Sequence, residues 1–301
     1  MGATLAWLRN ALALISASNK VHVSAAVAVY IASTLVYALR TVIVMHWQGV
    51  HVSLRDSYIA YLMNMFVNNI TPSARAGGEL VRAAFIARRY GLSLPSVINV
   101  VAFERATEAI GIVVLVVFTA LYGIYDLKSS EYLAAISAAI FLALLIIYRY
   151  WDRLFHAAMV RLERRGWLRY DSSETLWFSD MLSNKVLLAI GVLFGVMVWF
   201  LDALRLYFIG KALGVEMDLV RYIGVSVLYA GIGLLAVTPG GLGIVEGGLT
   251  AVLVALGVSP GDAIAVTLIE RLISYGLGTL LGAMGLVAAG GMKAWKALRS
   301  Q

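Results

Sequence analysis

The chain has 301 residues, of which 61% are hydrophobic and 14% charged, and its formal net charge is +7. A soluble domain carries about 25% charged residues, so this chain has too little polar surface to cover a soluble particle of its size. The sequence contains no cysteine, which excludes disulfides, thiol nucleophiles and cysteine-ligated metals. The composition predicts an all-α polytopic membrane protein in the plasma membrane.

Apolar runs suited to crossing a bilayer recur along the chain. A transmembrane helix needs about 20 mostly apolar residues. Two further segments, 73–90 and 243–256, are too short or too amphipathic and are interpreted as half-helices or re-entrant pieces. The seven candidate spans are residues 21–47, 57–70, 97–125, 132–150, 186–213, 219–237 and 263–289.

The longest polar segment is an arginine-rich linker, residues 151–184. Because Lys and Arg mark cytoplasmic loops, we expect this linker in the cytoplasm, with an amphipathic surface helix over 154–168. The basic tail 290–301 favours the same side, whereas seven full spans would place the chain ends on opposite sides. The positive charge indicates anionic lipid headgroups rather than nucleic acid as its partner.

The two halves of the chain share a motif. A Thr-Pro pair is followed at equal spacing by a glutamate, and later by a Glu-Arg pair. This similarity predicts two structural repeats, at about 20–125 and 185–289, with an extra span over 131–150 between them. The matched positions are Thr71, Pro72, Glu79, Glu104 and Arg105 in the first half and Thr238, Pro239, Glu246, Glu270 and Arg271 in the second.

Both Thr-Pro pairs interrupt apolar segments. Pro72 and Pro239 each remove a backbone donor and end the preceding helix, while Gly240, Gly241 and Gly243 permit a non-helical turn. Backbone groups freed at membrane depth are tolerated only inside protein or beside a wet cavity. Such paired interruptions point to a binding site between repeats. We therefore expect both turns to line a cavity where broken or re-entrant half-helices meet near the bilayer midplane.

Several ionisable side chains fall inside the apolar runs. Each charge at the bilayer centre costs at least ~2.5–3.5 kcal/mol, so we expect these charges to be paired or hydrated. Glu104 and Glu108 share a helix face at i,i+4 with Arg105 turned away, and other pairs are local at i,i+3. The alternative for these charges is a purely structural role. For Arg40, snorkelling of the side chain to the membrane interface is a second alternative. The supporting charges are Arg40, Glu108, Asp202 and Arg205.

The segments TPSARAGGELVR and TPGGLGIVEGGL, each followed by a Glu-Arg pair, resemble a known family. They are similar to the flippase-like membrane domain of the lysyl-phosphatidylglycerol synthase/flippase family. Because the chain ends soon after residue 289, the resemblance implies a stand-alone member without the aminoacyl-transferase domain, which excludes lipid aminoacylation. The motif positions that the resemblance assigns are Pro72, Arg75, Gly78, Glu79, Arg82, Glu104, Arg105, Pro239, Gly240, Gly241, Gly243, Glu246, Glu270 and Arg271.

Three functions compete at this point. The leading one is a lipid translocase that moves a polar-headgroup phospholipid or glycolipid through a central charged cavity, without a cofactor or metal. Arg75, Arg82, Arg105 and Arg271 would contact phosphate, and a buried carboxylate could bind a proton. A secondary transporter of a small polar solute fits the repeats equally well. An intramembrane enzyme ranks last, because the sequence lacks a nucleophile motif or a metal-binding pattern. A homodimer and a separate lipid-synthesising enzyme stay open as partners.

Overall fold

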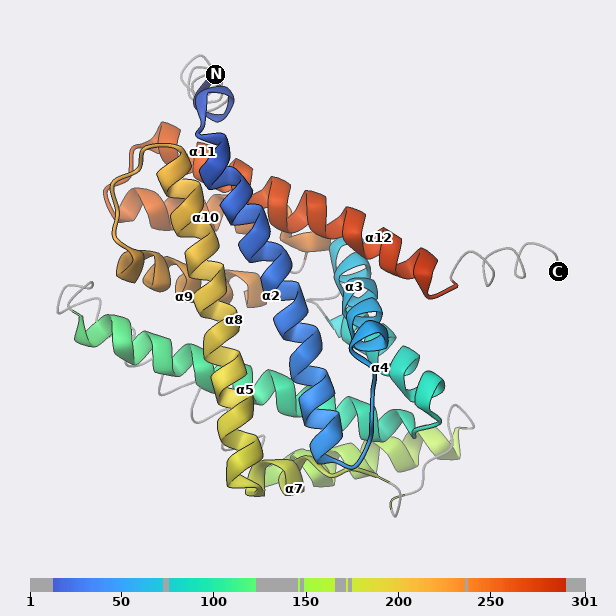
Figure 1. The fold of residues 1–301 in the computed structure, drawn as a ribbon. Helices are drawn as coiled ribbons and strands as arrows, with labels where there is room; N and C mark the ends of the chain where they lie inside the picture. The colour runs from blue at the N-terminus through green and yellow to red at the C-terminus, as the bar shows by residue number, and fades with distance from the viewer. Residues whose placement is uncertain are drawn as a thin grey trace. The chain divides into compact units, whose positions relative to one another are not determined.

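The computed structural model describes residues 13–72, 76–122, 146, 149–165, 172, 175–235 and 238–290. Every named element in these residues is a helix (Figure 1), and residues 149–164 of the linker are also helical. In chain order the elements are α2 (Lys20–Trp47), α3 (Leu54–Ile70), α4 (Ala76–Tyr90), α5 (Leu94–Leu121), α7 (Phe178–Ser183), α8 (Lys185–Ala212), α9 (Leu219–Leu235), the 3₁₀ turn η1 (Pro239–Gly241), α10 (Ile244–Ala255), α11 (Pro260–Arg271), the π-turn η2 (Leu272–Leu277) and α12 (Gly278–Ala288).

Three stretches of the described chain are long and apolar enough to cross a membrane. They are α2, α8 and the continuous run Pro260–Ala288. Helix α5 has 28 residues but carries three charges in its middle, and α3 and α9 have 17 residues each. At 1.5 Å per residue, 17 residues reach about 25 Å, less than the hydrocarbon thickness of ~30 Å. The structure therefore supports three of the seven predicted spans by length and composition. Most of 132–150 lies outside the described residues.

The helices of the two halves match in order and length. Helices α2 and α8 have 28 residues each, and α3 and α9 have 17 each. The shorter α4 and α10 have 15 and 12 residues, followed by 28 residues in α5 and 29 in Pro260–Ala288. This agreement supports the predicted repeat, which remains a prediction, as do the re-entrant segments.

The joints between short and long helices are also built alike. A glycine with positive φ, Gly91 (+65°) or Gly257 (+89°), ends the short helix, as is usual where only glycine avoids a steric penalty. The hydroxyl of Ser93 or Ser259 then accepts a backbone N–H of the long helix, which carries proline in its first turn. The same local sequence signals therefore fold both joints.

Contacts divide the chain into two compact units. Unit 1 comprises residues 1–35, 61–78 and 198–301, and unit 2 comprises 36–60 and 79–197. These units do not coincide with the predicted repeats, because each takes residues from both halves. Helices α2, α3 and α8 each contribute to both units.

Each unit has its own packed interior. In unit 2 the buried side chains of Phe103, Phe178 and Met181 belong to one apolar cluster, in which α7 packs on α5. In unit 1, α10 packs on α9 and α11. A methyl group added at Gly282 would lie 2.8 Å from the carbonyl oxygen of Leu62. The glycines of α12 thus allow a close helix approach.

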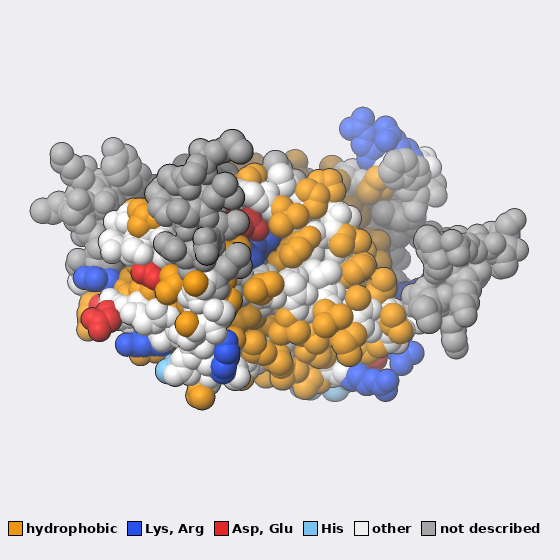
Figure 2. Space-filling model, turned by 90° about the horizontal axis from the view of Figure 1, so that it is seen from above, with side chains coloured by type: hydrophobic (Ala, Val, Ile, Leu, Met, Phe, Trp, Pro, Cys, Tyr) orange, Lys and Arg blue, Asp and Glu red, His pale blue; other side chains and the backbone are white. Residues whose placement is uncertain are grey.

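Hydrophobic side chains also cover much of the surface. Figure 2 shows them gathered on one face, with Lys and Arg toward its margins. On α12, Leu280, Met284 and Val287 are each more than half exposed. Exposed apolar area of this extent is typical of a surface that contacts lipid.

Candidate functional site

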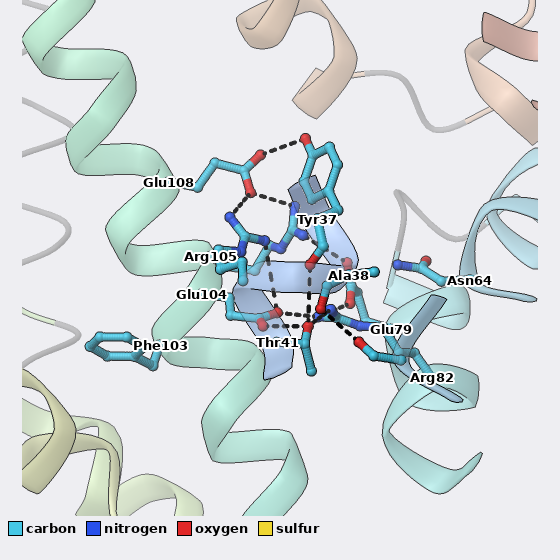
Figure 3. Close-up of polar contacts among 12 residues, drawn as sticks. Tyr37, Ala38, Thr41, Asn64, Glu79, Arg82, Phe103, Glu104, Arg105 and Glu108 are labelled. Carbon is cyan, nitrogen blue, oxygen red and sulfur yellow. Dashed lines mark hydrogen bonds and ion pairs between the residues drawn. The ribbon is translucent and has the colours of Figure 1, made fainter. Parts of the chain in front are cut away.

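Helix α5 places Glu104 at the centre of a buried network in unit 2 (Figure 3). Its carboxylate pairs with Arg82 at 2.6 Å and Arg40 at 3.7 Å, and the hydroxyl of Thr41 donates a hydrogen bond to it at 2.6 Å. Neither arginine is more than 1% exposed. A buried carboxylate needs such partners because water cannot compensate its charge.

The other two glutamates of this network follow the same rule. Glu108 pairs with Arg40 and with Arg105, both at 3.0 Å. Glu79 pairs with Arg82 at 2.9 Å and with Arg105 at 3.4 Å. Each of the three carboxylates of this network therefore contacts two guanidinium groups, and the network contains as many positive as negative charges.

Two sequence-based expectations fail in this network. Arg105 is not turned away from the glutamates of its helix, because its long side chain reaches Glu108 one turn further along. Arg40 does not snorkel to an interface: its side chain is 0% exposed and pairs with two glutamates. Contact of Arg82 with phosphate stays a prediction; in the structure its side chain is buried and pairs with Glu79 and Glu104.

Unit 1 holds a smaller charged group. One nitrogen of Arg205, Nη2, donates to both Asp202 Oδ1 and Glu270 Oε1, the latter at 3.1 Å. Tyr229 donates to the same oxygen of Glu270 at 3.1 Å, and Ser226 donates to Asp202 Oδ2 at 3.2 Å. Two carboxylates thus share one guanidinium group. The predicted local pair of Asp202 and Arg205 is present, together with a longer-range partner in Glu270.

The second Thr-Pro turn is held by ionic contacts. Gly240 and Gly243 have φ values of +57° and +84°. Glu246 accepts the N–H of Gly243 at 2.6 Å and pairs with Arg271 at 2.8 Å. Arg271 also donates to the carbonyl oxygen of Gly240 at 2.7 Å and lies 5.0 Å above the ring of Tyr275. One arginine thereby fixes both ends of the turn.

The first Thr-Pro turn belongs to the same unit. Asn69, just before it, donates at 2.9 Å to Thr279 of α12. Asn68 accepts the backbone N–H of Gly78 at 2.9 Å. No room exists for a side chain at Gly78, because a methyl group there would overlap Asn64 and Asn68. These contacts hold the described part of the turn against the helices of unit 1.

The two turns meet at one polar pocket of about 110 Å³. Asn68, Asn69 and Thr71 line it from the first turn. The second turn contributes Thr238, Gly240 and Gly241, and Arg271, Tyr229 and Ser274 complete the polar lining. A pocket with two amides, several hydroxyls and one guanidinium suits a polar or hydrogen-bonding group.

A second, more open cavity of about 720 Å³ lies along α10 and α11. Its lining is almost wholly apolar and includes Val254, Ile264 and Leu268. Glu246 lines this apolar groove, whereas its ion-pair partner Arg271 lines the polar pocket. The Glu246–Arg271 pair is therefore the boundary between the polar pocket and the apolar groove.

The predicted site residues separate into distinct places. Arg75 lies outside the described residues. Pro72, Gly78, Pro239 and Gly243 belong to the two turns and their flanks. Members of the polar pocket are Thr71, Thr238, Gly240, Gly241 and Arg271. The buried unit 2 network comprises Arg40, Glu79, Arg82, Glu104, Arg105 and Glu108.

Sequence reasoning missed four polar residues of the pocket. The adjacent Asn68 and Asn69 precede the Thr-Pro pair, and two amides at the end of an apolar run could have drawn notice. Ser274 belongs to a π-turn, an insertion common at functional sites that no residue pattern foretells. Tyr229 looks like any other aromatic residue of an apolar helix.

Comparison with known proteins agrees with this helical, lipid-facing structure. The family described as the lysylphosphatidylglycerol synthase TM region matches residues 2–282. The chain belongs to this family. The family is one of membrane proteins, and the long apolar helices of the structure agree with that assignment.

Three relatives are UPF0104 membrane proteins. A UPF0104 membrane protein of Methanothermobacter thermautotrophicus is 28% identical over 295 residues, covering 90% of this chain and 85% of the relative. A UPF0104 membrane protein of Pyrococcus horikoshii is 27% identical over 283 residues, covering 85% and 84%. One from Methanocaldococcus jannaschii is 23% identical over 286 residues, covering 90% and 85%.

Proposed function

We propose that this protein is a lipid translocase that moves a polar-headgroup phospholipid or glycolipid between leaflets. A translocase must offer a polar path to the headgroup while the acyl chains stay in an apolar environment. The observation that supports this proposal is the ion pair between Arg271, which lines the polar pocket, and Glu246, which lines the apolar groove.

The two cavities have matching chemistry for the two parts of a lipid. In the pocket, Arg271 has guanidinium N–H groups beyond those that bind Glu246 and Gly240, and Asn68 has one amide N–H beyond the one given to Asn64, so both can donate to phosphate or sugar oxygens. In the groove, Val254 and Leu268 offer apolar surface for an acyl chain. A small polar solute would need the pocket but not the groove, so the groove favours the lipid.

The proposal treats the chain as a carrier and not as an enzyme. Its family membership supports lipid handling in general, because the family name refers to a lipid synthase membrane region. Energy for directional movement would come from outside the chain or from an ion gradient, since the sequence has no nucleotide-binding motif.

The test fills the groove without touching the ion pair. Ala251 is exposed and lines the groove, so Ala251→Trp should block acyl-chain entry. Leu280→Trp is the matched control, because Leu280 is an exposed apolar residue of α12 that lines neither described cavity. Purified variants in liposomes would be assayed for leaflet exchange of fluorescent anionic, zwitterionic and glycosylated lipids.

We expect Ala251→Trp to slow exchange at least about tenfold, a barrier change of ~1.4 kcal/mol, while Leu280→Trp exchanges lipid at the native rate. Equal exchange by both variants would contradict a role for the groove. Absence of exchange for every lipid class in the native protein would favour transport of a small polar solute through the pocket alone.

A further inference from the structure

We propose that Glu270 in unit 1 is a proton-binding site that exchanges its proton with the polar pocket through Ser274. The site itself is independent of lipid movement, whereas any coupling of the proton to a lipid rests on the function proposed above. The ligand is one proton delivered by hydronium. It forms an O–H bond at Glu270 Oε2 and leaves a water molecule behind.

The charge count around Glu270 supports this inference. Asp202 and Glu270 share the single guanidinium group of Arg205, while Arg271 is occupied by Glu246 and the Gly240 carbonyl. The Asp202–Arg205–Glu270 group therefore carries one uncompensated negative charge. Two carboxylates that share a site in a low-dielectric interior do not both ionise readily. One bound proton brings the group to neutrality.

The hydrogen bonds decide which carboxylate oxygen takes the proton. Asp202 Oδ1 accepts from Arg205, and Asp202 Oδ2 lies 3.2 Å from the hydroxyl of Ser226, whose single proton it shares with the carbonyl oxygen of Trp199. Glu270 Oε1 accepts from Arg205 and Tyr229. Glu270 is 0% exposed, and its Oε2 has no hydrogen-bond partner among the described residues. An ionised oxygen in that position would be costly, whereas a protonated one is not.

The structure also provides an exchange path. Ser274 lies one turn beyond Glu270 on the same helix face, with its hydroxyl close enough to interact with the Glu270 carboxyl group, and its Oγ has no other hydrogen-bond partner within the described chain. The Ser274 hydroxyl can accept the acid proton and pass another to the pocket, which it lines. Tyr229 lines the same pocket. Protonation of Glu270 is thus linked through Ser274 to the pocket where a polar group would bind.

Besides Arg205 and Arg271, no cation lies near Glu270 on the described elements packed around it. Helix α2 contributes an aromatic ring over the Arg205 guanidinium at 5.5 Å rather than a charge. The charged and titratable groups around Glu270 are Asp202 and Arg205 of α8, Tyr229 of α9, Glu246 of α10, Arg271 of α11 and Tyr30 of α2.

Infrared spectroscopy of the purified full-length protein tests the site without any lipid assay. A protonated buried carboxyl group gives a carbonyl stretching band that disappears as the pH rises. We expect this band in the native protein and its loss in Glu270→Gln. Glu104→Gln is the matched control at the corresponding position of unit 2, where Glu104 contacts two guanidinium groups, and it should keep the band.

A second variant keeps the test informative if the first variant misfolds. Asp202→Asn leaves Glu270 in place but gives it sole use of Arg205, so the group becomes neutral without a proton and the band should also be lost. Melting curves would verify the fold of each variant. A native protein without the band at neutral pH, or a band that persists in Glu270→Gln at that pH, would overturn the proposal. If the native protein shows the band but exchanges no lipid, only the proposed function would be contradicted.

Discussion

The two charged groups of this protein occupy corresponding positions but have different charge balance. In unit 2, each of three glutamates contacts two arginines. In unit 1, each of three carboxylates contacts one. At the position that matches Arg82, eleven residues after the threonine of the motif, unit 1 has the buried apolar Leu249. The charged groups of unit 1 therefore have two arginines for three carboxylates.

This difference separates a structural use of buried charge from a functional one. A fully paired network favours one arrangement of its helices but offers little to a ligand. A group with a shortage of partners retains the ability to bind something else. On the proposed function, the same Glu-Arg motif serves both purposes, depending on how many partners surround it.

The largest expected effect comes from making unit 2 resemble unit 1. Arg82→Leu removes a partner from both Glu79 and Glu104. Because it leaves buried carboxylates under-compensated, we expect a loss of about 3–5 kcal/mol in the free energy of unfolding. Denaturant titration of the purified variant in detergent would measure it. A loss below about 1 kcal/mol would show that Arg82 is dispensable for the network.

Substitutions of the two equivalent glutamates should affect different properties, stability for Glu79 and lipid exchange for Glu246. Glu79→Gln weakens two ion pairs and should cost about 1.5–3 kcal/mol of stability. Glu246→Gln weakens the partner of Arg271, at the boundary of the pocket, so it should slow lipid exchange about tenfold at a smaller cost in stability. Unfolding and liposome exchange would be measured on both variants. Identical behaviour of the two would contradict the division between the units.

The turn itself can be tested through its backbone. Gly240→Ala places a side chain at φ +57°, against the ring of Tyr275, and should cost about 1–2 kcal/mol from the left-handed backbone alone. Gly231→Ala is the control, because open space surrounds that position in α9 and alanine stabilises a helix by about 0.5–1 kcal/mol. Thermal unfolding should therefore move in opposite directions. A Gly240→Ala variant as stable as the native protein would show that the turn is not constrained.

The smallest effect is expected at an exposed pair of unit 2. Arg89 lies 3.4 Å from Asp56, but its side chain is 62% exposed. Exposed ion pairs contribute about 0–1 kcal/mol, so Arg89→Ala should change the free energy of unfolding by less than about 0.5 kcal/mol. A loss comparable to that of Arg82→Leu would mean that burial does not explain the strength of the network.

Sequence patterns predicted the local features of this fold well. Proline and glycine correctly indicated the interruptions at Pro72 and Pro239, and helix periodicity indicated the i,i+3 pair of Asp202 and Arg205. Sequence patterns did not predict contacts between residues far apart in the chain. The pairing of Arg40 with Glu108 joins residues on separate helices, and periodicity within one helix carries no information about it.

The repeat motif relates some of the contacts between residues far apart in the chain. Arg40 and Arg205 occupy corresponding positions, as do Glu104 and Glu270, and the structure pairs each arginine with the glutamate of its own unit. The sequence did not reveal the number of partners, because that depends on side chains such as Arg82 that pack against the motif from another helix.

The π-turn between α11 and α12 has a consequence for the helix that follows it. One residue more than an α-helix needs enters this turn, and each residue rotates the succeeding face by about 100°. Without the extra residue, the face with Gly278 and Gly282 would be rotated by about 100° from Met65 and Phe66 of α3, which these glycines now adjoin. The turn thereby rotates the following helix face, so that one continuous helix directs Glu270 toward the charged group and its glycines toward a neighbouring helix.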